Sequence, residues 1–159
     1  MALKVLYTIF LGILIALFVG IGIAAFYTAP TPPEAPAILQ YPISSNSSVD
    51  LAAQKVAQDQ FNQTQKTYQT AYANYNRRVS IISLIAAIVI LVVALGMVTK
   101  ILLISDGLLL GGVLTLIYSI IRGFMGENTI YRFIVVTFGL LIALAIGYVK
   151  FIKPDLRQS

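Results

Sequence analysis

Few residues of this chain can do acid–base, redox or metal chemistry, and they are scattered. The sequence has no Cys and no His, so the usual ligands of zinc, copper, haem and iron–sulfur clusters are missing, as are thiol and imidazole catalysts. No two acidic residues stand three or four positions apart, the spacing that shares a helix face. The acidic residues are Glu34, Asp50, Asp59, Asp106, Glu127 and Asp155. We therefore predict no enzyme, no catalytic residue, no metal site and no cofactor.

Two charged residues stand beside or inside an apolar run and form a candidate intramembrane polar site. Asp106 lies in a Ser-Asp-Gly triplet that predicts a turn and a helix start, with Asp106 as the N-cap. The alternative is an acid inside lipid, which would be a proton or cation site. Arg122 stands near the end of the same run, and we expect its side chain to reach the lipid headgroups. Glu127 is an alternative partner for it.

The positions of these residues depend on membrane spans, which dominate the composition. The chain is 58% hydrophobic with a mean hydropathy of +0.88, and it has only 11 basic and 6 acidic residues in 159. Four runs are long and apolar enough to cross a bilayer: 5–27, 80–99, 107–125 and 133–148. The basic residues cluster near span ends, where they anchor in headgroups. The lipid bilayer is thus an expected partner and nucleic acid is not.

Small residues recur every four positions in three of the spans. The longest series is in the third span, and such ridges predict close helix contact. For the first span we favour packing within the chain, with a dimer interface as the alternative. The series are Gly107, Gly111, Thr115, Ser119 and Gly123; Gly12, Ala16, Gly20 and Ala24; and Gly139, Ala143 and Gly147.

Between the first two spans lies a Pro-rich arm followed by a polar helix. Prolines and Leu39 recur every third residue in the arm, which places them on one face of a polyproline II helix. These positions are Pro30, Pro33, Pro36, Leu39 and Pro42, with Tyr27 extending the series. Ser47 and Asp50 mark a helix start. No Pro or Gly occurs between Pro42 and Gly96, so this helix is expected to continue into the second span.

The polar helix carries a stripe that suits the prolines. Aromatic and small residues alternate at spacings of four and three, so they share one helix face. They are Ala57, Phe61, Thr64, Tyr68, Ala71 and Tyr75, with Tyr72 and Val79 flanking. Aromatic rings bind polyproline surfaces well, so the arm is expected to pack there; the alternative is a disordered linker beside a frayed helix. The segment resembles the pancreatic-polypeptide hairpin in architecture, which implies no hormone activity.

The predicted fold is an all-α integral membrane protein with four transmembrane helices, the second of them extended outward and packed against the polyproline-like arm. Its parts are a first span or signal anchor at 1–27, the arm at 28–46, an extramembrane helix at 47–79, the second span at 80–100, the third and fourth spans at 101–152, and a tail at 153–159. Residues 101–105 are expected to form a connector near the interface. Counting basic residues near span ends slightly favours cytoplasmic termini and an external hairpin, in a bacterial or archaeal cytoplasmic membrane.

The leading hypothesis is a structural or interaction protein: a four-span anchor or accessory subunit that presents the hairpin and self-associates or joins a larger membrane complex. The interaction and packing residues would be Pro30, Pro33, Pro36, Phe61, Tyr68, Tyr72, Tyr75, Gly107, Gly111, Thr115 and Ser119. The alternative is an oligomeric small channel or transporter with Asp106 and Arg122 near the path.

Overall fold

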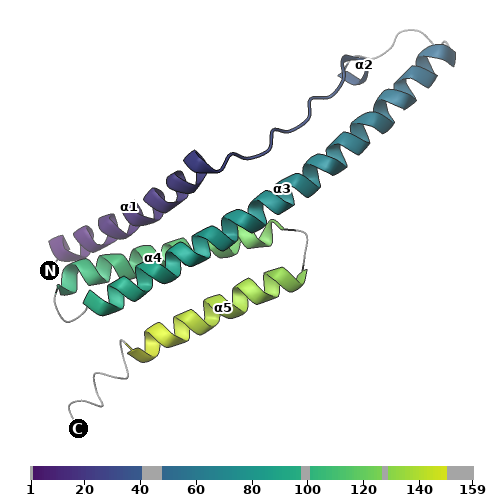
Figure 1. Cartoon of the computed structure of the whole chain (residues 1–159). Coiled ribbons are helices and arrows are strands. Elements are labelled where there is room, and N and C mark those ends of the chain that lie inside the picture. Colours follow the sequence, from purple (N-terminus) through teal and green to yellow (C-terminus); the bar gives the residue numbers. More distant parts are fainter. Residues whose placement is uncertain (1, 41–47, 98–100, 127–128, 150–159) are drawn as a thin grey trace. The chain divides into compact units, whose positions relative to one another are not determined.

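The computed structural model describes residues 2–40, 48–97, 101–126 and 129–149, and within these ranges it is all-helical with no strand (Figure 1). The helices are α1 (Ala2–Phe26), α2 (Ala37–Gln40), α3 (Ser48–Met97), α4 (Leu102–Phe124) and α5 (Thr129–Gly147). They divide into two compact units. The first, 1–28 with 76–159, is called the bundle; the second, 29–75, is called the arm unit. The single helix α3 contributes to both.

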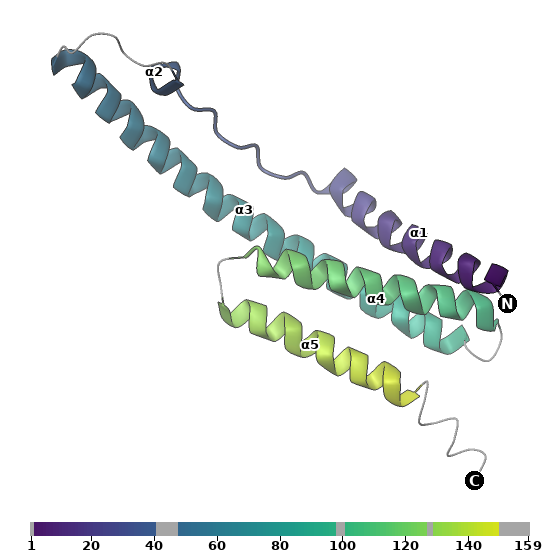
Figure 2. The ribbon, with the colours of Figure 1, turned by 180° about the vertical axis from the view of Figure 1, so that it is seen from behind.

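Helix α4 is the centre of the bundle and contacts its three neighbours (Figures 1 and 2). It runs parallel to α1, because Gly107 lies against Leu11 and Gly111 against Ile15. It runs antiparallel to α3, because Ser119 pairs with Ser80 and Ser105 bonds to Ala94 further along. It is also antiparallel to α5, where Gly123 faces Val135 and Gly139 faces Ile120.

The side chains inside the bundle are mostly small or polar, and those on its surface are mostly large and apolar. The buried residues of α4 are Ser105, Gly107, Leu109, Gly111, Gly112, Thr115, Leu116, Ser119 and Gly123. Large apolar side chains instead cover the surface, among them Leu3, Phe18, Val92, Ile121, Phe133 and Leu140. Lipid is as apolar as these side chains, so they gain nothing by turning inward, and small residues let helix backbones approach. With four helices long and apolar enough to span a bilayer, this is an integral membrane protein.

The boundaries confirm the expected spans and correct one connection. Helix α3 runs 50 residues without a break, as the absence of Pro and Gly predicts, although Ser47, its expected cap, lies outside the described residues. Helix α4 begins at Leu102, after the N-cap Ile101, which makes no side-chain cap. The prediction of an interfacial connector at 101–105 is therefore wrong, and so is Asp106 as an N-cap. Apolar residues from Leu102 onward extend the helix by more than a turn.

The arm unit keeps the expected period of three over part of its length. Pro30, Pro33, Pro36 and Leu39 are all half-buried, while most residues between them are exposed. The expected extended conformation ends earlier than the sequence predicts, because Ala37–Gln40 form the short helix α2, in which the Leu39 amide donates to the Pro36 carbonyl at 2.9 Å. Pro42 lies outside the described residues.

One face of the outer part of α3 is sheltered along its length. The sheltered residues, here called the protected strip, are Gln54, Ala57, Phe61, Tyr68, Tyr72 and Tyr75. Thr64 and Ala71, which the sequence placed on this stripe, are exposed. Each residue turns a helix by about 100°, which puts these two just beyond one edge of the strip, while Gln54 and Tyr72 lie at its other edge.

Candidate functional site

One of the close helix contacts in the bundle lies where α4 crosses α1. A Cβ added at Gly107 would come within 2.5 Å of Leu11, and one at Gly111 within 2.8 Å of the Ile15 side chain. Gly12 of α1 sits equally close to Leu110. Higher along α1 the ridge opens, because a Cβ at Gly20 would meet nothing within 4 Å. The first half of the α1 ridge therefore packs within the chain.

The second half of the α4 ridge packs on α3 through reciprocal serine bonds. The Ser80 hydroxyl donates to the Ser119 carbonyl at 2.8 Å, and the Ser119 hydroxyl donates to the Ser80 carbonyl at 2.8 Å. Both residues are fully buried, as is Thr115 at 1% exposure, whose hydroxyl donates to the Gly111 carbonyl. Toward the other end, Ser105 donates to the Ala94 carbonyl at 2.8 Å. These bonds set the register of α3 against α4.

Arg122 points into the bundle. Its Nη1 donates to Oδ1 of Asn76 on α3 at 2.8 Å, and its Nε donates to the Tyr118 hydroxyl at 3.1 Å. Its guanidinium also lies 5.5 Å from the centre of the Tyr118 ring, and Asn76 is completely buried. Arg122 therefore contacts α3 inside the bundle, a contact that the sequence did not predict, and the expectation that it reaches the lipid headgroups stays a prediction. Glu127, the alternative partner, lies outside the described residues.

Three more arginines occupy the same end of the bundle as Arg122. Arg132 of α5 donates from Nε and Nη2 to the Gly126 carbonyl, at 2.9 and 2.6 Å, and so caps the end of α4. The Arg77 guanidinium lies 5.2 Å from the centre of the Tyr131 ring, and the Tyr131 hydroxyl donates to the Arg77 carbonyl at 3.2 Å. These contacts tie α5 to α3 and α4.

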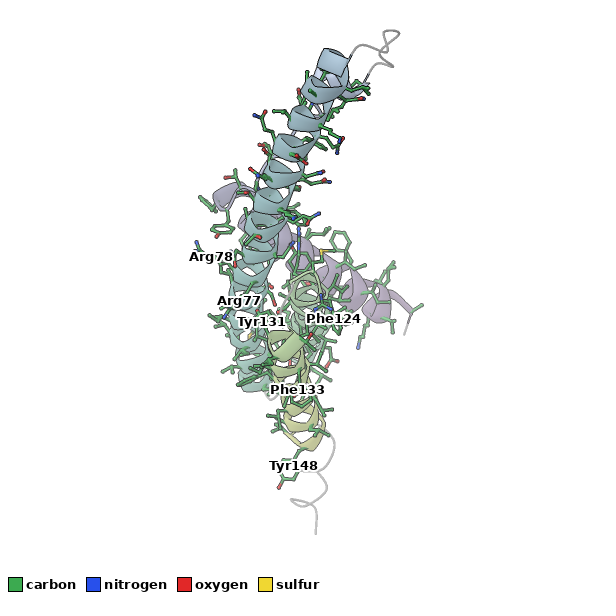
Figure 3. All side chains as sticks on the ribbon, turned by 90° about the vertical axis from the view of Figure 1, so that its right-hand side faces the viewer. Arg77, Arg78, Phe124, Tyr131, Phe133 and Tyr148 are labelled. Atoms are coloured by element: carbon green, nitrogen blue, oxygen red, sulfur yellow. The ribbon has the colours of Figure 1, made fainter. Side chains whose placement is uncertain are left out.

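Arg78, next to Arg77, holds the end of α1. Its Nη1 donates to the Tyr27 hydroxyl at 3.2 Å. The four arginines and the tyrosines that contact them are here called the arginine end of the bundle: Arg77, Arg78, Arg122 and Arg132 with Tyr27, Tyr118 and Tyr131. Figure 3 labels Arg77, Arg78 and Tyr131, which belong to this end of the bundle, and Tyr148 at the far end of α5.

Asp106 lies toward the opposite end of α4. It is half-buried in the second turn of the helix, where it lines a groove of about 470 Å³ together with Lys4 and Thr8 of α1. Asp106 and Arg122 are 16 residues apart on one helix, which at about 1.5 Å per residue separates them by about 24 Å. The structure therefore does not bring the two candidate polar residues together.

Three tyrosines of the arm unit form an aromatic ladder along α3. The ring centres of Tyr68 and Tyr72 are 5.8 Å apart and those of Tyr72 and Tyr75 are 6.2 Å apart, with the planes inclined by 25° and 26°. Tyr68 and Tyr72 are half-buried and Tyr75 is only 8% exposed. Phe61 continues the protected strip two turns earlier.

Sequence reasoning missed the α3 side of the bundle. The small-residue series predicted from the sequence lie in the other three spans, yet the buried face of α3 carries polar and small residues that pack toward the α4 ridge. They are Asn76, Ser80, Ser83, Ala87 and Ala94. Their spacings of four, three, four and seven are a helix-face signal that was readable in the sequence. Gly112, which lies against Leu91, was missed because it falls outside the four-residue series.

Comparisons with protein-family models, with curated proteins and with solved structures find no match for this chain.

Proposed function

We propose that this membrane protein is a structural or interaction protein: a four-span anchor that presents the arm unit outside the bilayer to a second copy or to a larger membrane complex. The observation that carries the proposal is that residues 29–75 form a compact unit of their own, with a sheltered aromatic strip and an otherwise exposed polar helix. A folded unit of this size, built from an arm and one helix, offers a surface to which another protein can bind.

The proposed core of the arm unit is a polyproline arm packed on the protected strip. Three residues of polyproline II rise about 9.3 Å, while seven residues of α-helix rise about 10.5 Å. Prolines every third residue therefore nearly match rings such as Phe61, Tyr68 and Tyr75, which are seven apart. The half-buried state of Pro30, Pro33 and Pro36 supports this match.

The surface offered to a partner is the face of α3 opposite the protected strip. It is exposed and mostly polar between residues 51 and 75, with Asp59, Gln63, Lys66 and Thr70 in successive turns. A face of this kind suits a hydrogen-bonded interface with a polar rim, the ordinary composition of non-obligate contacts. The bundle then acts as the anchor, with its interior already filled by the contacts of α4.

Cysteine crosslinking tests the proposal, because the chain has no native Cys. Thr70→Cys places one thiol on the exposed face, and Ala57→Cys places one on the protected strip as a matched control. With a thiol-reactive bifunctional reagent in native membranes, Thr70→Cys should give one discrete product of higher mass and Ala57→Cys much less. Monomer alone from Thr70→Cys, across reagents of several lengths, would contradict an interaction role.

A small oligomeric channel is the second candidate, and one observation favours it. Asp106 lies a full turn inside α4, as a membrane acid would, and acids at such depth often serve ion pathways. Against it stands the filled seam between α3 and α4, where the described serine and threonine hydroxyls already bond to carbonyls. Ion flux through liposomes should be absent; flux that disappears with Asp106→Asn would favour the channel.

A further inference from the structure

Four arginines gather at the arginine end of the bundle. The acceptors of their hydrogen bonds include the Asn76 amide, the Gly126 carbonyl and the Tyr27 and Tyr118 hydroxyls, which are neutral groups. Among the described residues of the bundle the acid is Asp106, about four and a half turns away from Arg122 along α4. Even with the charge of Glu127 in the α4–α5 loop included, four arginines leave a surplus of three positive charges.

The tyrosines place this end at the membrane surface. Tyr is enriched where hydrocarbon meets headgroups, because its ring is apolar and its hydroxyl is polar. Tyr131 and Tyr148 are 17 residues apart, about 25 Å at 1.5 Å per residue, close to the ~30 Å of a hydrocarbon core. Figure 3 shows the two at opposite ends of α5. The arginine end therefore lies at the depth of lipid phosphates.

Arg77 and Arg78 are the two arginines placed to contact a ligand, since both are exposed whereas Arg122 and Arg132 are half-buried. Neighbouring residues on a helix point about 100° apart. Arg77 accordingly lies over Tyr131 of α5, and Arg78 reaches Tyr27 beyond α1. A guanidinium has five N–H donors in a planar fork that fits a phosphate, and the bond from Arg78 to Tyr27 uses one.

We propose that the arginine end binds the headgroups of anionic phospholipids, one on each side of α3, through Arg77 and Arg78. Each guanidinium is steadied by a tyrosine, which lowers the entropy lost when it bonds a phosphate. The half-buried charge of Arg132 adds attraction for a net negative headgroup and repels the cationic amine of a zwitterionic one. This inference rests on residence in the membrane and not on the proposed interaction role.

The test uses the purified full chain in neutral detergent, with lipid binding counted by native mass spectrometry and stability followed by thermal unfolding. Phosphatidylglycerol should bind and raise the unfolding temperature, whereas phosphatidylcholine and inorganic phosphate at equal concentration should not. Arg77→Gln with Arg78→Gln should weaken phosphatidylglycerol binding about tenfold or more. Lys55→Gln with Lys66→Gln removes the same charge from the arm unit and should leave binding unchanged.

Equal binding of phosphatidylglycerol by the arginine double variant and the wild type would overturn the proposal, as would equal shifts from phosphatidylcholine or from inorganic phosphate. The wild-type protein gives a reading that needs no variant to fold. Raising the salt concentration from 0.05 to about 1 M shortens the Debye length to about 3 Å, so the stabilisation by phosphatidylglycerol should shrink. Stabilisation that salt leaves unchanged would mean acyl-chain contact alone, and would also overturn it.

Discussion

At the scale of single residues, Asn76 shows how a neutral side chain positions a charge among membrane helices. It is completely buried, and it accepts a 2.8 Å hydrogen bond from Arg122, which comes from another helix. A half-buried guanidinium without an acceptor would lose solvation that it does not recover. The sequence predicted neither partner, because the two residues are 46 positions apart and nothing local marks Asn76 as different from Asn74.

Asn76→Ala should therefore lower the free energy of unfolding by about 1 to 2 kcal/mol. The reason is that the Arg122 guanidinium loses the acceptor that holds it between α3 and α4. Unfolding in mixed micelles with increasing denaturing detergent measures the change. Asn74→Ala is the matched control, because Asn74 is exposed on the same helix. Equal losses from the two variants would show that the bond to Arg122 contributes nothing to stability.

At the scale of elements, the sequence predicted which helices exist better than it predicted the residues at which they begin and end. Hydropathy located all four spans, and the absence of Pro and Gly predicted the continuity of α3. The start of α4 was misplaced because Asp106-Gly107 has the chemistry of a helix start, while the helix already begins at Leu102, in apolar residues, and Ser105 within it donates to the Ala94 carbonyl. The arm lost its regular conformation at Ala37, where a helical turn competes successfully with the extended chain.

The crossing of α1 and α4 gives the sharpest prediction about packing. Gly111→Ala should destabilise the bundle by about 1 to 3 kcal/mol, because its Cβ would lie 2.8 Å from the Ile15 Cβ and 3.2 Å from the Gly12 carbonyl oxygen. Gly20→Ala controls for the higher helix propensity of Ala, since its Cβ meets nothing within 4 Å. Thermal unfolding in detergent compares them. A Gly111→Ala protein as stable as Gly20→Ala would refute a tight crossing.

The arm offers two adjacent prolines that test its proposed packing. Pro33 is half-buried and Pro32 is exposed. In Pro33→Ala the arm unit should be cut several-fold faster in limited proteolysis. The substitution removes apolar contact, and it also raises the conformational entropy of the unfolded chain. Pro32→Ala raises the entropy of the unfolded chain in the same way but removes no buried contact, so it should be cut more slowly than Pro33→Ala. Equal cleavage rates would indicate that the period of three has no packing role.

At the scale of the whole molecule, α3 joins a bundle with an apolar, lipid-compatible surface to a polar arm unit. The bundle is filled by small and hydroxyl residues, and its surface is apolar. The arm unit has a sheltered aromatic strip and a polar exterior. This division was readable in composition alone, because hydropathy changes abruptly near Ser80. The arginine end was not, because it assembles from α3, α4 and α5 through contacts between residues distant in sequence.

Helix α3 is one continuous helix, and we propose that its first part lies in water and its second part lies in lipid. Single cysteines at Thr70 and Val92, both exposed in the structure and both on α3, test it with a membrane-impermeant maleimide in intact cells. Thr70→Cys should react rapidly and Val92→Cys should not, which would place the arm unit in water outside the cell. Equal resistance of the two positions, or equal reactivity, would contradict this division of α3 between water and lipid; reaction of Thr70→Cys only after the cells are opened would contradict the external orientation.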